Sequence, residues 1–233
     1  MSSPTSRAGR PPAELAPATL DEILGGALRM FADKGYDGAS VAALNRQLGV
    51  SHNLIHQRFG SKEQLWYATV DWAFGGIAAE LLPEADDTSG GPLEQFRRTV
   101  RRFIHVHAHR PEILRLLTVE GVTDTPRLDH LYERHIEPML EIVAAPLQRL
   151  MDEGVIAPVP RRTLHFLVAH GASAPFSLIG LARRIGPGDP LDPQAVAEHA
   201  DVVADLILAG LQHRPLPGAR VDPQTATGTG AAP

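Results

Sequence analysis

The chain has 233 residues, 43% of them hydrophobic, which is enough to bury a sizeable core in one large domain or in a small domain joined to a larger one. It has no cysteine, and this excludes disulfides, thiolate metal sites and thiol-based redox catalysis. The formal net charge of -5 argues against nucleic-acid binding driven by bulk charge, although it leaves room for a local DNA-binding face.

The pattern of apolar residues predicts an all-α fold. Alternation typical of strands is nearly absent, whereas apolar side chains recur at helical spacing, in about nine helices. Residues 1–17 and 214–233 are rich in Pro, Gly, Ala and Thr, so we expect a flexible N-terminal tail and a disordered C-terminal tail. The N-terminus lacks the apolar segment of a secretory signal, and a cytoplasmic location fits best.

The first predicted helix begins at Thr19, because Thr19 and Glu22 have the spacing of a capping box. Gly35 predicts its end. Ser40 is expected to cap a second, short helix that closes at Gly49. The apolar face of the first helix comprises Ile23, Leu24, Ala27, Leu28 and Phe31.

A third helix is expected to be capped by Ser51 and to end at Gly60, with Ile55 and Phe59 buried one turn apart. A second capping box at Ser61 begins a fourth helix. Helical periodicity then predicts further helices over residues 93–110, 112–119, 127–153, 161–185 and 193–211.

Two of these later stretches have special features. Pro138 and Pro146 are expected to kink the helix over residues 127–153. Residues 164–182 carry no charged side chain, but His165, His170 and Pro175 interrupt them, so burial in protein is expected rather than a membrane crossing.

The second and third helices are too short to persist alone in water, so they must pack on the first helix. Two such helices joined by a tight turn at Gly49 form a helix-turn-helix. With Ile55 and Phe59 turned inward, the outward side chains are rich in hydrogen-bond donors suited to base edges or phosphates. They are His52, Asn53, His56 and Gln57.

Three segments carry a family resemblance: Phe31-Ala-Asp-Lys-Gly-Tyr-Asp-Gly-Ala-Ser40-Val41, Leu48-Gly-Val-Ser51 and Phe59-Gly-Ser-Lys-Glu63. Together they resemble the N-terminal signature of regulators of the tetracycline-repressor (TetR) type. The resemblance is specific over residues 23–65 and loose beyond them. It implies a homodimer on a near-palindromic double-stranded DNA operator, repression by occlusion, and release when a small molecule binds the C-terminal body.

The resemblance also implies roles for individual residues. Ser40 and Lys62 would contact phosphates, and the recognition helix would read bases through Ser51, His52, Asn53, Leu54, His56 and Gln57. The chain departs from the usual pattern at three positions. Asn45 replaces a small residue, His56 replaces a phosphate-contacting tyrosine, and Leu54 replaces a small polar residue, so the operator sequence cannot be taken from a relative.

The division of the chain follows from this interpretation, with a DNA-binding domain over residues 18–64 and a helical effector-binding and dimerisation domain over 65–213. Apolar side chains of the second domain would wall a pocket for an apolar or aromatic effector, although they also suit an ordinary core. The expected pocket residues are Phe96, Phe103, His107, Leu117, Tyr132, Ile136, Phe166 and His170.

Small residues in the stretch 161–185 and apolar residues in the last helix predict a dimer interface of four helices, two from each chain. The alternative is that the last helix packs only on its own body. The expected interface residues are Ala169, Ala172, Ser173, Val196, Val203, Leu206, Ile207 and Gly210.

Two other hypotheses stay open. His105 and His109 lie one turn apart, and with Glu120 or His135 they would form the metal site of a metal- or pH-responsive DNA-binding sensor. We favour histidines without a ligand role, and therefore predict no metal and no cofactor.

No phosphate loop, nucleophile elbow or catalytic Ser/His/Asp spacing is present, so we expect no enzyme. An all-helical interaction module without DNA binding is the remaining alternative.

Overall fold

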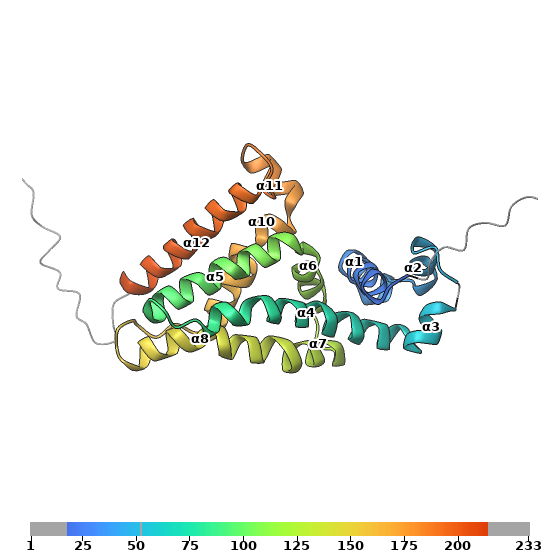
Figure 1. Ribbon diagram of the computed structural model, residues 1–233, viewed down its shortest axis with the longest axis horizontal. Coiled ribbons are helices and arrows are strands. Elements are labelled where there is room, and N and C mark those ends of the chain that lie inside the picture. The colour runs from blue at the N-terminus through green and yellow to red at the C-terminus, as the bar shows by residue number, and fades with distance from the viewer. Residues whose placement is uncertain (1–17, 52, 214–233) are drawn as a thin grey trace, which may run out of the picture. The chain divides into compact units, whose positions relative to one another are not determined.

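The computed structural model describes residues 18–51 and 53–213 and divides the chain into two compact units, Met1–Ala73 and Phe74–Pro233. The division falls within one long helix, α4 (Lys62–Asp86). Every regular element in the two described ranges is helical, which confirms the all-α prediction (Figure 1). The predicted tails, 1–17 and 214–233, and His52 lie outside the described residues.

The first unit begins with α1 (Leu20–Gly38), and the predicted capping box is confirmed. The Thr19 hydroxyl accepts a hydrogen bond from the Glu22 N–H at 3.2 Å, and the Glu22 carboxylate accepts one from the Thr19 N–H at 2.7 Å. The predicted apolar face of α1 is buried. At Gly35 the backbone leaves the helical region, with φ of 66°, so the helix turns there as expected before a last short segment.

The helix-turn-helix comprises α2 (Val41–Gln47) and α3 (Leu54–Phe59). Ser40 caps α2 as predicted, because its hydroxyl accepts a hydrogen bond from the Ala43 N–H at 3.3 Å. The prediction that Ser51 caps α3 is wrong. The residue before α3 is Asn53, and Ser51 instead accepts the Leu54 N–H with its backbone carbonyl at 3.1 Å.

Two glycines allow the close packing of these short helices. Gly49 lies in the turn with φ of 66°, a left-handed conformation that costs glycine little. Gly26 of α1 leaves room for α2, because a Cβ there would lie 3.1 Å from a methyl carbon of Leu44. The beginning of α4 completes this core with Leu65, Trp66, Thr69 and Val70.

Trp72 of α4 links two helices of the first unit. It is 38% exposed, and its indole N–H donates a hydrogen bond to the Asp21 carboxylate on α1 at 3.0 Å. One end of the α4 segment in this unit is therefore tied to the first turn of α1.

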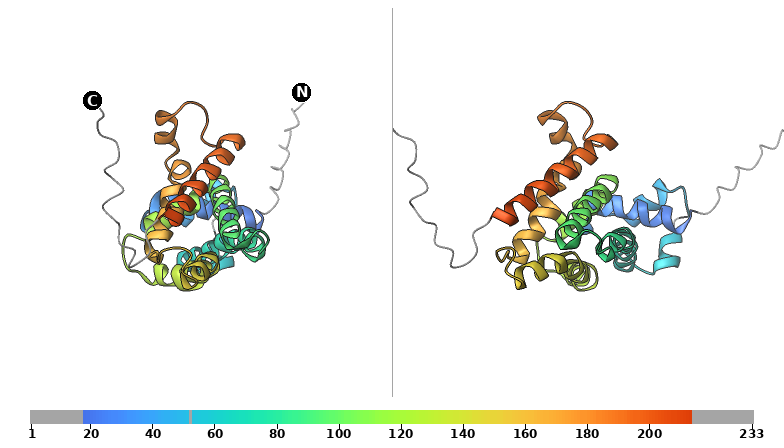
Figure 2. Two further views of the ribbon diagram at one scale, coloured as in Figure 1. Left: turned by 90° about the vertical axis from the view of Figure 1, so that its left-hand side faces the viewer. Right: turned by 60° about the vertical axis from the view of Figure 1, so that its left-hand side comes forward.

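The second unit is built around α5 (Gly91–His109), which packs on both α8 (Glu137–Asp152) and α12 (Pro193–His213). Figures 1 and 2 show α12 next to α5. α6 (Pro111–Glu120) follows α5 after a tight turn at Arg110. The buried core consists of Phe96, Val100, Ile104, Ala108, Leu147, Leu150, Ile156, Val168, Ala172, Phe176, Val196, Ala200, Ala204, Ile207 and Leu211.

The predicted helix over residues 127–153 is interrupted by a wider turn. α7 (Pro126–Leu131) leads into a π-helical segment, η1 (Tyr132–Ile136), and then into α8. Pro138 explains the interruption, because it has no N–H and its ring crowds the carbonyl one turn earlier. The expected kink at Pro138 therefore takes the form of a π-helical turn, whereas Pro146 lies inside α8.

The predicted helix over residues 161–185 is divided more strongly. It consists of α9 (Arg161–His165), the π-helical segment η2 (Phe166–Ala172), α10 (Ala174–Ser177) and α11 (Ile179–Ile185). Pro175 lies at the start of α10, where a missing N–H is tolerated. In residues 18–51 and 53–213, no helix combines the length and the hydropathy needed to cross a bilayer.

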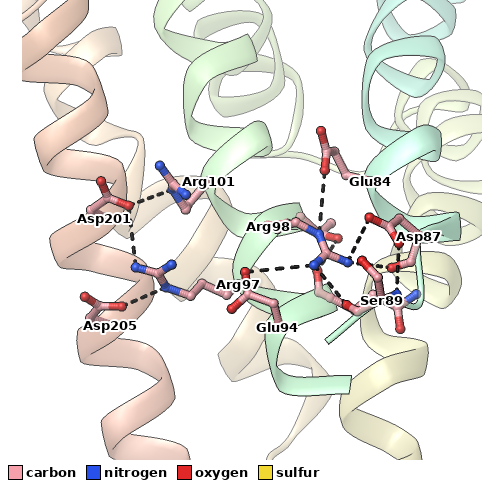
Figure 3. Close-up of polar contacts among 11 residues, drawn as sticks. Glu84, Asp87, Ser89, Glu94, Arg97, Arg98, Arg101, Asp201 and Asp205 are labelled. Atoms are coloured by element: carbon pink, nitrogen blue, oxygen red, sulfur yellow. Dashed lines mark hydrogen bonds and ion pairs between the residues drawn. The ribbon is translucent and has the colours of Figure 1, made fainter. Parts of the chain in front are cut away.

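Arginines of α5 hold its two neighbours in the second unit (Figure 3). On one side, Arg97 pairs with Asp205 at 2.9 Å and Arg101 pairs with Asp201 at 2.7 Å, which fixes α12 against α5. On the other side, Arg98 donates to the backbone carbonyls of Asp87 and Ser89 at 2.7 and 3.0 Å. Arg98 thereby holds the loop between α4 and α5.

Candidate DNA-binding face and effector cavity

The third helix presents a polar face, as the sequence pattern predicts. Ile55 is 1% exposed and anchors α3 in the core, while Asn53, His56 and Gln57 are exposed. The spacing of these residues follows from the helical repeat, because a residue buried at position 55 leaves positions 53, 56 and 57 on other sides. His56 Nδ1 bonds the Gly60 carbonyl at 3.2 Å, so the second ring nitrogen, Nε2, points away from this carbonyl.

The remaining predicted DNA contacts have different surroundings. Ser40 and Ser51 are exposed, whereas Leu54 is half-buried. His52 lies outside the described residues. Asn45, where a small residue is usual, is buried within the first unit and is 2% exposed.

Lys62 has two partners that the sequence did not reveal. Its ammonium group lies 4.5 Å from the centre of the Tyr36 ring and donates to the Asp37 carbonyl at 3.3 Å. A cation over an aromatic face is attracted to the ring electrons, so Tyr36 restricts where the charge lies. Tyr36 and Asp37 supply the two contacts from consecutive positions at the end of α1.

The second unit contains a cavity of about 300 Å³, which is at the lower end of the range for small-molecule sites. Its lining is mainly apolar and comes from α4, α5, α6, α8 and α9 and from both π-helical segments. The lining residues are Phe74, Ile77, Ala78, Leu82, Phe96, Phe103, His107, Ile113, Leu114, Leu117, Arg134, His135, Ile136, Pro138, Met139, Leu140, Ile142, Val143, Ala144, Arg161, Leu164, His165, Val168 and Ala169.

Five of the eight pocket residues expected from the sequence line this cavity: Phe96, Phe103, His107, Leu117 and Ile136. The other three do not. Tyr132 and Phe166 are exposed, with the Tyr132 hydroxyl 3.4 Å from the Glu137 carboxylate. The His170 ring stacks on Phe166 at 5.2 Å between centroids. The contributions of α4 and α8 to the lining were not predicted, although the apolar spacing at Phe74, Ile77 and Val143 indicates them.

His107 is the most buried polar group of the cavity lining, at 3% exposed. Its Nδ1 bonds the Phe103 carbonyl at 2.8 Å, and the Phe103 ring lies against it with 3.9 Å between centroids. Burial lowers the pKa of His107 to about 4; the Phe103 carbonyl raises this pKa, and the charges of His170 and Arg110 lower it. The imidazole is therefore neutral at pH 7.

His105 and His109 do not form a three-ligand group with Glu120 or His135 in the described part of the chain. His109 Nδ1 bonds the backbone carbonyl of His105 at 2.7 Å. Glu120 is buried and pairs with Arg127 at 3.0 Å, and it accepts a hydrogen bond from the Thr125 hydroxyl at 2.7 Å. Among the described residues, neither His105 nor His109 belongs to a group of three side chains with ligand atoms within 4.8 Å of one another.

Most residues expected at the dimer interface are covered by the protomer itself. Ala169, Ala172, Ser173, Val196 and Ile207 are buried within the second unit. Val203 is half-buried, while Leu206 and Gly210 are exposed. The exposed side of α12 also includes Val202 and Ala209, so Leu206 lies in an apolar strip with helical spacing.

A helix-turn-helix with a polar, exposed third helix, in the same chain as a helical unit with an apolar cavity, defines a DNA-binding regulator. Residues 23–68 match the profile of bacterial regulatory proteins of the tetR family. Residues 92–207 match the profile of the tetracyclin repressor-like C-terminal domain. The chain belongs to the TetR family of bacterial transcriptional regulators.

Similar proteins include curated transcriptional repressors. The repressor AcnR of Corynebacterium glutamicum is 49% identical over 147 residues, covering 62% of this chain and 72% of AcnR. The repressor SCO4008 of Streptomyces coelicolor is 29% identical over 153 residues, covering 65% and 74%. The crystal structure of the TetR family regulator PfmR from Thermus thermophilus matches with a TM-score of 0.58 and 25% identity, covering 84% of this chain and 98% of PfmR.

Proposed function

We propose that the chain represses transcription as a homodimer on a near-palindromic operator and leaves the DNA when a small apolar or aromatic molecule binds the cavity of the second unit. The observation that carries the DNA-binding part is the polar, exposed side of α3, opposite the buried Ile55. Amide and imidazole groups there suit base edges in a major groove. Ser40 and Lys62 supply additional contacts to phosphates.

The apolar effector follows from the composition of the cavity lining. Nineteen of its residues are apolar, and charged side chains are restricted to Arg134 and Arg161. Arg161 is already paired with Glu141 at 2.5 Å. A ligand with an extended apolar body would therefore gain most from entering, because it exchanges water for hydrophobic walls.

The dimer would form on α11 and α12. Leu178, Leu181 and Ile185 are more than half exposed around α11, and Val202 and Leu206 are more than half exposed on α12. Large apolar side chains gathered on consecutive helices favour an interface, and a twofold contact would cover each of them twice. The interface we propose is thus the exposed strip of α12 with α11, rather than the residues buried within the protomer.

Selection of DNA from a random pool by the full chain tests the DNA-binding part. We expect a palindrome with half-sites about one helical turn apart. Asn53→Ala and Gln57→Ala should each weaken binding to the selected site by about 1 to 3 kcal/mol per lost base contact. Gln148→Ala makes the same chemical change on α8 and should bind like the wild type. An unselective pool, or full affinity in both α3 variants, would contradict the proposal.

A further inference from the structure

His107 lines the cavity, and the surrounding protein determines which nitrogen of its imidazole carries the proton. His107 Nδ1 bonds the backbone carbonyl of Phe103 at 2.8 Å. A carbonyl oxygen only accepts hydrogen bonds, so the proton of the imidazole must reside on Nδ1. The other nitrogen, Nε2, then carries a lone pair and acts as an acceptor.

The ring has little freedom to reverse these roles. It is 3% exposed, and the Phe103 ring lies against it at 3.9 Å between centroids, with an interplanar angle of 30°. Both side chains line the cavity. Burial also lowers the pKa of His107 to about 4, so a second proton does not reach Nε2 at neutral pH.

Among the described residues, no other protein group bonds the His107 side chain. An acceptor at the wall of an apolar cavity is costly to leave without a donor. We infer that the effector donates a hydrogen bond to His107 Nε2, and that it is an uncharged, mainly apolar molecule with a hydroxyl or N–H group. This inference rests on the proposed effector role of the cavity.

Two other classes of ligand cannot donate this hydrogen bond to His107 Nε2. A ketone or ether has an apolar body of the same size but brings only lone pairs to face Nε2. A carboxylate would have to lose its water in an apolar cavity, and it too would bring only lone pairs to that atom. Its natural partners would be Arg134 or Arg161 of the lining.

A matched pair of probes tests the hydrogen bond, namely 2-decanol and 2-decanone, which share one carbon skeleton and differ in the donor. Isothermal titration of the full chain should give a Kd for 2-decanol about tenfold lower than for 2-decanone. In His107→Phe, which keeps a ring but has no acceptor, the two probes should bind within about twofold of each other.

His109→Phe is the matched control, because His109 lies one helical half-turn along on α5 and makes the same type of bond, 2.7 Å to the His105 carbonyl, but is exposed. It should retain the preference for 2-decanol. If His107→Phe does not fold, the wild-type preference alone still decides the question. Decanoate serves as a third probe for recognition by an arginine.

Three results would overturn the inference, and they differ in what they leave standing. Equal binding of 2-decanol and 2-decanone to the wild type would overturn the inference and leave the apolar effector cavity supported. Tighter binding of decanoate than of 2-decanol would overturn it as well, and would assign recognition to Arg134 or Arg161. Binding of none of the three probes would overturn the effector cavity itself, and with it the inference.

Discussion

The ammonium group of Lys62 lies over the Tyr36 ring. The charge of Lys62 and the position in which the ring holds that charge can therefore be tested by separate substitutions. Lys62→Ala should weaken binding to all DNA sequences alike and reduce the slope of log affinity against log salt by about 0.9, the contribution of one phosphate contact. Tyr36→Leu keeps the charge and loses the ring, so it should weaken binding while leaving the salt slope unchanged. Affinity titrations between low and moderate salt measure both quantities. An unaltered slope in Lys62→Ala would count against the phosphate contact.

His107 links the cavity to the stability of the fold through its pKa. Its pKa in the folded protein is about 4, against 6.5 for the free side chain, so between these values the unfolded chain binds more protons. The stability due to neutral His107 is therefore complete above about pH 6.5 and is lost as the pH falls to about 4. A shift of this size corresponds to about 3 kcal/mol.

Urea unfolding at pH 7 and at pH 4.5 measures this loss. In His107→Phe the difference between the two pH values should shrink by about 2 kcal/mol, because the buried titrating group is gone. His109→Phe, altered at an exposed position, should keep the wild-type difference. The same pH dependence in His107→Phe as in the wild type would show that other groups dominate acid unfolding.

The first half of α5 and the loop before it depend on one arginine. Arg98 donates to two loop carbonyls and lies 3.2 Å from the Asp87 carboxylate, with 20% of its side chain exposed. Arg98→Met keeps the apolar stem and should cost about 2 kcal/mol of unfolding free energy, since bonds from a charged donor are lost. Chemical denaturation measures this. Arg183→Met removes an exposed pair with Asp189 and should cost less than about 1 kcal/mol.

Helix caps and buried helix positions were predictable from the sequence. The capping residues Thr19 and Ser40 and the buried Ile55 follow from side-chain chemistry within one helical turn, so their places were found correctly. The cap at Ser51 was not, because Asn53 is closer to the start of α3 and the turn between the helices is longer than assumed.

The three expected pocket residues that do not line the cavity share one kind of local structure. Tyr132, Phe166 and His170 all lie in the π-helical segments, where each turn contains more residues than an α-helical turn. An extra residue rotates the side chains that follow it by about 100°, so a single period of 3.6 does not hold across such a segment, although Ile136 at the end of η1 lines the cavity as expected. The proline at 138 hinted at a kink, but the sequence does not say whether a kink will be a bend or a wider turn.

At the scale of the assembly, the exposed strip of α12 gives a direct test of the proposed dimer. Leu206 is 68% exposed in the protomer, so Leu206→Glu leaves the fold of one chain intact but would place a carboxylate in the interface. We expect a monomer by light scattering, together with loss of operator binding. Val122→Glu, at a position that is 77% exposed outside α11 and α12, should stay dimeric. A Leu206→Glu dimer of unchanged tightness would place the interface elsewhere.

The position of the two tryptophans has a consequence for spectroscopy. Trp66 is buried in the first unit and Trp72 is bonded to Asp21 there, and the chain has no third tryptophan. Indole fluorescence therefore reports only on the unit that contains the helix-turn-helix, whereas far-ultraviolet circular dichroism averages over all helices. Two-state unfolding requires the two signals to change together. A fluorescence midpoint below the dichroism midpoint would give, without any label, the separate stability of the DNA-binding unit.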